Sequence, residues 1–273
     1  MQDTENHKKS NKNNRGIISM IGLFGGFFGG LLGIGGSFLV IPFLKGVIKI
    51  SPHKAHATAL PVAFASGISA LGFYFTSGQV DIGLSVYVMI GCLTGVMFGS
   101  KLMNYVKGNL LSLMFGFFLL ALAVVFALPI SPISPMDSHT DLYTITISVI
   151  LGLFAGLSSG LFGAGGGTIL VPGIVLLLGV GEHMAQGISL LVIIPTTLLG
   201  TWMHYKQKKL SLTVAPWLTI SSFAGGLLGG FFAILTHVTI LKSLIVIALL
   251  YIGFDNIRKN LRTKKISSVN QTM

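Results

Sequence analysis

The sequence predicts an all-α integral membrane protein with eight hydrophobic segments in two homologous halves. Three observations predict this fold class. The 273 residues are 52% hydrophobic but only 9% charged, long stretches carry no charged side chain, and one glycine-rich motif occurs twice. Soluble domains carry about 25% charged residues, so the composition excludes an ordinary soluble enzyme.

The stretches without a charged side chain define the first seven segments. They cover residues 16–44, 55–80, 82–100, 108–136, 142–181, 183–205 and 210–241. The eighth segment covers about residues 239–257, with Lys242 and Asp255 near its ends. A membrane helix needs about 20 apolar residues, and its backbone groups must be bonded internally. Each segment is therefore expected to be helical, whereas the polar, basic residues 1–15 and 259–273 are predicted to be disordered tails.

The chain repeats itself at an offset of 130 residues, without a gap. Ten of the 21 positions in residues 22–42 are identical to their counterparts in residues 152–172. The offset continues beyond this motif, where His53 corresponds to His183. A chance match of glycine-rich stretches does not explain a constant offset. The sequence therefore predicts a first half at 16–130, an extracytoplasmic linker at 131–141 and a second half at 142–258.

Each half carries a glycine cluster in the middle of its first segment, at residues 33–37 and 163–167. Glycine permits positive φ, so each helix is expected to break there and return as a hairpin. Two hairpins put 17 of the 18 basic residues on the cytoplasmic side, whereas eight full crossings would leave six outside. Three crossings per half then invert the second half relative to the first, a design common in transporters. Both termini, Ser51 and Lys208 are expected to be cytoplasmic.

The sequence leaves the depth of the hairpins open. Incoming arms of about 17 residues would span about 25 Å at 1.5 Å per residue. The hairpins could therefore be half-depth or nearly full-depth, and both give the same inversion.

The glycine clusters are also the strongest candidate for a binding site. A returning arm that begins near Ser37 or Thr168 presents the unpaired N–H groups and partial positive charge of a helix N-terminus. Such groups suit a small anion without any charged side chain. The alternative is that the glycines only allow close helix packing. The candidate substrate-binding residues are Gly33, Gly35, Gly36, Ser37, Gly163, Gly165, Gly166, Gly167 and Thr168.

Hydroxyl residues near two expected proline kinks, at Pro61 and Pro195, form a second candidate group. They either hydrogen-bond a substrate or, as is more common, bond their own helix backbone. The candidates are Thr58, Ser66, Ser189, Thr196 and Thr197.

Four histidines are open to two interpretations. They are gating or proton-sensitive groups, because histidine titrates near neutral pH, or ordinary residues at helix ends. They are His53, His56, His183 and His204.

The sequence gives no reason to expect a metal site, a cofactor or a nucleic-acid partner. The single cysteine excludes an intramolecular disulfide and a cysteine-based metal cluster. Basic residues occur in short clusters typical of cytoplasmic loops. Two Gly-x-x-x-Gly pairs, at 95–99 and 225–229, indicate close helix contacts, within one chain or, alternatively, in a homodimer.

The duplicated motif resembles the TauE/SafE family of sulfite or sulfonate exporters and related permeases. Both halves carry Gly-Leu-x-x-Gly-x-x-x-Gly-Leu-x-Gly-x-Gly-Gly, followed by Val-Ile-Pro at 40–42 and Leu-Val-Pro at 170–172. The resemblance covers about residues 16–258. Ser37 departs from the pattern at the third glycine, and residues 187–189 read Gly-Ile-Ser where the first half has Ala-Thr-Ala.

The resemblance implies a multi-pass permease of the plasma membrane for a small, often sulfur-containing anion. We therefore expect a transporter, in the direction of export, that works by alternating access around the paired glycine loops. The alternative is a non-transporting accessory or assembly subunit of a membrane complex. A membrane enzyme is not expected, because the sequence has neither a Ser-His-Asp arrangement nor HExxH.

Overall fold

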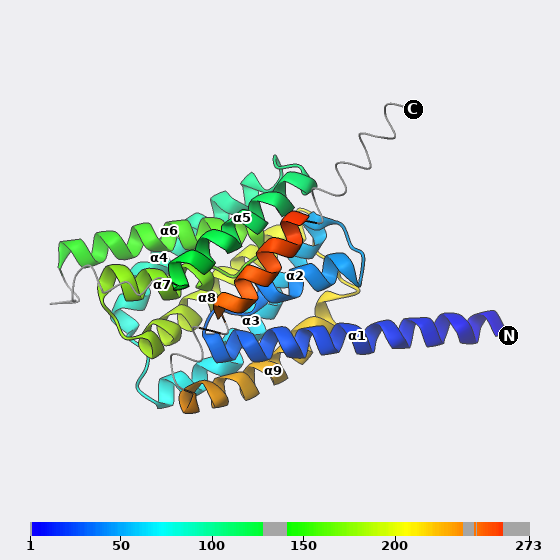
Figure 1. Ribbon diagram of the computed structural model, residues 1–273, viewed down its shortest axis with the longest axis horizontal. Coiled ribbons are helices and arrows are strands. Elements are labelled where there is room, and N and C mark those ends of the chain that lie inside the picture. Colours follow the sequence, from blue (N-terminus) through cyan, green and yellow to red (C-terminus); the bar gives the residue numbers. More distant parts are fainter. Residues whose placement is uncertain (1, 128–140, 237–242, 244, 259–273) are drawn as a thin grey trace.

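The computed structural model describes residues 2–127, 141–236, 243 and 245–258, and within these residues the chain is helical with short connections (Figure 1). Residues 245–258 form a further helix after α9. The nine labelled helices are α1 (Gln2–Leu32), α2 (Ser37–Gly46), α3 (Pro52–Thr76), α4 (Ile82–Leu102), α5 (Gly108–Ala127), α6 (Leu142–Phe162), α7 (Gly167–Leu178), α8 (Glu182–Lys206) and α9 (Ala215–Leu235).

Seven of the described helices are long and apolar enough to cross a bilayer. They are α3, α4, α5, α6, α8, α9 and the part of α1 from Arg15 to Leu32. This confirms the all-α class with many apolar helices. Most of the expected linker (131–141), the start of the eighth segment and the tail at 259–273 lie outside the described residues.

Residues 2–14 are described as the N-terminal part of helix α1, and the expected disorder of residues 1–15 stays a prediction. Helix α1 begins at Gln2 and continues without a break into its apolar part.

Helix bounds and backbone conformations recur at the 130-residue offset. Helices α3 and α8 begin and end at corresponding residues. The only non-glycine residues with positive φ in the described chain are Lys49 (57°) and Lys208 (55°). Their counterparts are Gly179 (67°) and Gly78 (69°), so each half uses the same left-handed turn where the other carries glycine.

Replacing Lys49 or Lys208 with glycine is expected to stabilise the protein. A left-handed conformation costs an L-residue about 1–2 kcal/mol, part of which the added freedom of glycine in the unfolded chain offsets. We expect a gain of about 1 kcal/mol per site, measured by denaturant unfolding in micelles. Lys107→Gly, at a loop position without positive φ, is the matched control and should show no gain.

Close contacts at glycines fix the relative directions of the helices. A Cβ on Gly22 would lie 2.6 Å from the carbonyl oxygen of Leu218, and a Cβ on Gly30 would lie 2.6 Å from that of Gly226. Helices α1 and α9 therefore run side by side in the same direction (Figure 1). Helices α4 and α6 pair in the same way, through Gly91, Gly95 and Gly99 against backbone atoms of residues 149–157. Both Gly-x-x-x-Gly pairs thus make contacts within this chain.

Helices α3 and α8 run in opposite directions. Gly67 of α3 faces Leu190 and Ile194, whereas Gly200 of α8 faces Leu60. Helix α3 instead runs parallel to α9, because the Ser222 hydroxyl donates to the carbonyl of Val62 and a Cβ on Gly230 would touch Ala70. Since α1 and α3 are both parallel to α9, the chain must turn back through α2 between them.

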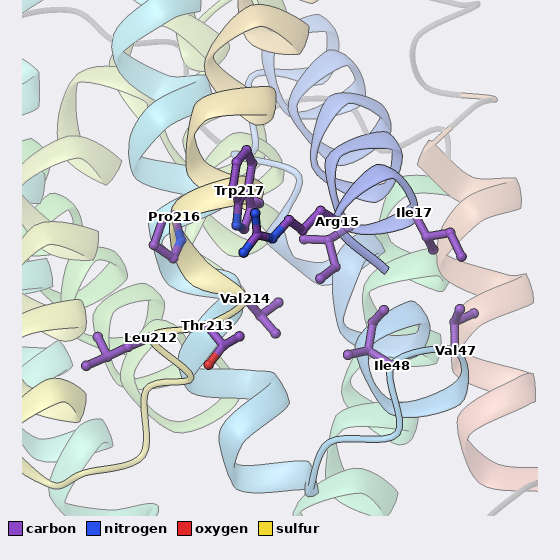
Figure 2. A pocket seen from close by; sticks show the side chains of 10 residues that line it. Arg15, Ile17, Val47, Ile48, Leu212, Thr213, Val214, Pro216 and Trp217 are labelled. Atoms are coloured by element: carbon purple, nitrogen blue, oxygen red, sulfur yellow. The ribbon is translucent and has the colours of Figure 1, made fainter. Parts of the chain in front are cut away.

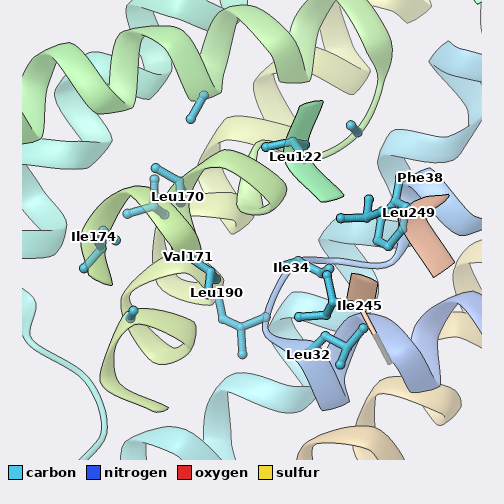
Figure 3. Close-up of a cluster of buried hydrophobic side chains, with 14 of the residues drawn as sticks. Leu32, Ile34, Phe38, Leu122, Leu170, Val171, Ile174, Leu190, Ile245 and Leu249 are labelled. Carbon is cyan, nitrogen blue, oxygen red and sulfur yellow. The ribbon is translucent and has the colours of Figure 1, made fainter. Parts of the chain in front are cut away.

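Large buried side chains surround the places where α1 and α6 break (Figure 3). Ile34 and Phe38 come from the first break and the start of α2, and Leu170 and Ile174 come from α7. All four side chains are fully buried. Polar groups at the breaks are therefore held in apolar surroundings, where a hydrogen bond is stronger and an unsatisfied polar group more costly.

Candidate functional site

The two glycine clusters break their helices where the sequence predicts. Helix α1 ends at Leu32 and α2 begins at Ser37, and the intervening Gly33, Gly35 and Gly36 have φ of 68°, 82° and 61°. Helix α6 ends at Phe162 and α7 begins at Gly167. We call residues 33–36 the first tip and residues 163–166 the second tip. Every residue of both tips is buried.

The two tips touch each other in the middle of the bundle. A Cβ on Gly167 would lie 2.6 Å from Ile34 Cα, and one on Gly165 would lie 3.2 Å from Ser37 Oγ. Both tips also meet Ala63, whose Cβ is 2.9 Å from a Cβ built on Gly35 and 3.0 Å from one built on Gly165. Ala63 lies halfway along α3. The glycines leave room for this convergence, because any side chain at these positions would collide.

The incoming arms reach past the centre of the bundle. Gly33 packs against Gln186, one turn from the start of α8, and Gly163 packs against His56, one turn from the start of α3. Because α3 and α8 are antiparallel, these two contacts lie towards opposite ends of the bundle. The tips therefore overlap, and each incoming arm passes the middle of the helix bundle.

Unpartnered hydroxyls lie at the start of both returning arms. Ser37 Oγ and Thr168 Oγ1 are fully buried and have no hydrogen-bond partner. A buried polar group left unsatisfied costs about 1–3 kcal/mol, so such groups in a folded protein call for an explanation. Both hydroxyls can donate, and each belongs to the first turn of a helix whose N–H groups have no partner within the helix. Each hydroxyl is therefore a buried donor that an anion at that helix start would satisfy.

The other predicted hydroxyls are in four different situations. Ser66 Oγ donates to the carbonyl of Gly35 (3.1 Å) and so braces the first tip, and Ser189 Oγ is buried without a partner. Thr196 and Thr197 donate to their own helix, to the carbonyls of residues 192 and 193, each at 2.7 Å. Thr58 Oγ1 accepts from the backbone N–H of residue 211 at 3.0 Å. Of these five hydroxyls, Ser66 is therefore the one for which the described residues show a hydrogen bond to a tip residue.

Two polar pairs hold the ends of the incoming arms. Tyr74 Oη shares its one proton between acceptors at the end of α1, including the carbonyl of Gly30 (3.3 Å) and Gln186 Oε1 (3.2 Å). At the end of α6, His204 Nε2 bonds the carbonyl of Gly160 (3.0 Å) and His56 Nδ1 bonds that of Phe162 (2.6 Å).

Sequence reasoning missed this correspondence, although the 130-residue offset carries its signal. At that offset Tyr74 corresponds to His204, and His56 corresponds to Gln186. The two tips are therefore held by side chains at equivalent positions of the repeat, but these side chains are of different chemical types.

A cavity of about 450 Å³ lies apart from the tips (Figure 2). It is enclosed by the start of the apolar part of α1, the turn after α2 and the start of α9. The Arg15 guanidinium lies 5.2 Å from the centre of the Trp217 ring beside it, a cation–π contact. Its lining includes no residue of either tip, so it is a feature separate from the glycine site.

Comparisons with known proteins agree with the helical, apolar character of the chain. A model of the family described as sulfite exporter TauE/SafE matches residues 2–126 and 148–272. The probable membrane transporter protein YunE of Bacillus subtilis is 26% identical over 235 residues, which cover 78% of this chain and 86% of that protein. YdhB of the same organism, also a probable membrane transporter protein, is 26% identical over 84% of this chain and 94% of its own. A probable membrane transporter protein of Xylella fastidiosa is 30% identical over 78% of this chain and 83% of its own.

Proposed function

This chain is a multi-pass membrane protein of the sulfite exporter TauE/SafE family of transporters, and from this membership we propose what it moves and how. The proposed substrate is a small anion, sulfite or an organosulfur compound, and the proposed direction is export across the plasma membrane. The observation that carries the proposal is the pair of buried, unpartnered hydroxyls, Ser37 and Thr168, at the opposed starts of α2 and α7.

In the proposed site an anion lies between the two tips. It accepts hydrogen bonds from Ser37 Oγ, Thr168 Oγ1 and the first N–H groups of α2 and α7. The helix dipoles of both arms add partial positive charge at this point. Because Ile34 and the start of α7 are in direct contact, the anion enters only when the tips separate. This separation is the movement that alternating access requires.

The proposed architecture has two halves of opposite orientation, at residues 16–130 and 142–258, with both termini in the cytoplasm. Two features of the packing support it. Helix α3 is antiparallel to its counterpart α8, and α1 is parallel to α3 across the short returning helix α2.

The orientation is tested by epitope tags at Ser51 and Lys208. Both tags are expected to be cytoplasmic, and therefore hidden from a membrane-impermeant reagent in intact cells. A tag in the loop at residues 77–80, which joins α3 to α4, is the control and is expected to be labelled from outside. Labelling of Ser51 from outside would contradict the proposed hairpins.

Transport is tested in proteoliposomes that contain only this protein. The vesicles are loaded in turn with sulfite, sulfoacetate, thiosulfate, sulfate and chloride, and release is followed over time. Saturable release of a sulfur-containing anion is the expected result. Folded protein that releases none of these anions would contradict the proposed substrate class and favour the alternative, an accessory subunit that is active only with a second protein.

A further inference from the structure

The second tip is held by two buried histidines that bond neighbouring carbonyls of one helical turn. His204 lies at the end of α8 and His56 near the start of α3, and both side chains are fully buried. Their partners, the carbonyls of Gly160 and Phe162, belong to the last turn of α6. The two bonded carbonyls lie only two residues apart on α6. They therefore form one cluster against the second tip.

Each ring keeps one nitrogen without a partner. A neutral imidazole has one N–H donor and one lone-pair nitrogen. Since Nδ1 of His56 and Nε2 of His204 donate to carbonyls, the lone pairs lie on His56 Nε2 and His204 Nδ1. Both of these atoms are buried and unpartnered. Protonation would turn each of them into a donor and would place positive charge beside the tip.

Among the described residues, the charged or titratable groups that act on the two rings from neighbouring elements are basic. Lys45 from α2 and His53 from α3 act electrostatically on His56, and Lys209 from the turn after α8 acts on His204. Lys45 Nζ is held by Ser112 Oγ (2.7 Å) and Asn256 Oδ1 (2.8 Å). Lys209 Nζ is buried without a partner, and its burial lowers the pKa of this ammonium group. A cluster of this kind needs negative charge as soon as a ring is protonated.

Neutral side chains complete the surroundings of the rings. Phe115 of α5 packs edge-on against His56, with 4.9 Å between ring centroids. Gln207 faces His204, and its Oε1 is also buried without a partner. This oxygen can accept from a protonated His204, whereas His56 Nε2 has no acceptor of this kind among the groups described. An anion would supply the missing acceptor and the missing charge together.

We propose that His56 and His204 form a proton-dependent anion site, in which a small oxyanion binds beside the second tip together with the protons taken up by the rings. The inference rests on the proposed transport function and deepens it, because it couples binding of the anion to uptake of protons by the two histidines. The step is an acid–base reaction: an O–H bond of hydronium breaks and an N–H bond forms at His56 Nε2 or His204 Nδ1. The anion accepts from His56 Nε2–H, and either the anion or Gln207 Oε1 accepts from His204 Nδ1–H.

The first tip shows what a pH-insensitive version of the same arrangement looks like. There Tyr74 and Gln186 occupy the positions of His204 and His56, and neither side chain titrates near neutral pH. The double variant His56→Gln, His204→Tyr therefore gives the second tip the pair that the first tip already uses. His183→Gln is the matched control, since His183 lies at the start of α8 away from the two rings.

The experiment measures binding of sulfate and of thiosulfate to the purified protein in detergent, from the rise in thermal midpoint with anion concentration. Both probes keep their charge between about pH 8 and about pH 5.5, so a change in affinity over this range reports protons taken up by the protein on binding. Linkage allows up to about a tenfold change in affinity per pH unit for each coupled histidine. For the wild type and for His183→Gln we expect affinity to rise ten- to a hundredfold on acidification. For the double variant we expect less than a twofold change.

A double variant with the pH dependence of the wild type would overturn the proposal, as would a wild type that binds neither anion at about pH 5.5. If the double variant does not fold, the single variants His56→Gln and His204→Gln each test the proposal, with a smaller slope expected. Because the readout is binding, it is independent of transport. Absence of flux with pH-dependent binding would count against the proposed function alone, and flux with pH-independent binding would count against this site alone.

Discussion

Alanine at Gly163 is expected to remove most of the folded protein. A Cβ at this position would lie 1.9 Å from the carbonyl oxygen of His56, and Gly163 has φ of 64°. The left-handed conformation costs about 1–2 kcal/mol and overpacking against fixed backbone adds about 1–3 kcal/mol. The combined loss, about 2–5 kcal/mol, is a large fraction of the total stability of a typical domain, about 5–15 kcal/mol. The measurement is the yield of monodisperse protein and its denaturant midpoint in micelles.

Two further glycines distinguish the cost of the left-handed conformation from the cost of overpacking. Gly78 has φ of 69° but open space around the added Cβ, so Gly78→Ala is expected to lose only about 1–2 kcal/mol. Gly72 lies within α3 with open space, and Gly72→Ala is expected to be neutral or slightly stabilising. If Gly163→Ala proved no more harmful than Gly78→Ala, the close packing of the second tip on α3 would be wrong.

Removing the hydroxyls of Ser37 and Thr168 is expected to impair transport without impairing the fold. Ser37→Ala and Thr168→Val take away buried groups that have no partner, so stability should be unchanged or slightly higher. A hydrogen bond to a charged group contributes about 1.5–3 kcal/mol, which corresponds to roughly ten- to a hundredfold in affinity for the anion. The expected result is an increase of this size in the KM for flux from proteoliposomes, for each variant.

The control for this pair is Ser148→Ala, another buried hydroxyl. Ser148 Oγ donates to the carbonyl of Thr144 within α6, far along the helix from the second tip. Its loss should leave KM unchanged and cost a little stability. Unchanged KM in both Ser37→Ala and Thr168→Val would remove these hydroxyls from the anion site.

The helix breaks were predictable from sequence because their cause is local. Only glycine adopts positive φ at little cost, so a glycine cluster within an apolar run predicts where a helix stops. Once the first break is known, the 130-residue offset of the repeat predicts the position of the second. The same reasoning predicted that α2 begins at Ser37, and it placed the start of α7 within one residue of Gly167.

The roles of the individual hydroxyls were not predictable. Helices α3 and α8 are apolar on nearly all sides, so periodicity does not reveal which face meets the tips. Ser66 faces Gly35, whereas its counterpart Thr196 bonds its own helix. The polar pairs at Tyr74 and His204 depend on contacts between residues far apart in the chain, and only the structure brings these residues to the ends of α1 and α6.

The most direct test of the central claim is to locate an anion in the structure of the purified protein. Crystals grown with selenate, an anomalous scatterer with the shape of sulfate, would give a peak at the anion. We predict a peak between the tips, within hydrogen-bond distance of Ser37 Oγ and Thr168 Oγ1, with the tips moved apart. A peak only in the cavity beside Arg15 and Trp217, or unchanged tips without a peak, would contradict the proposed anion site.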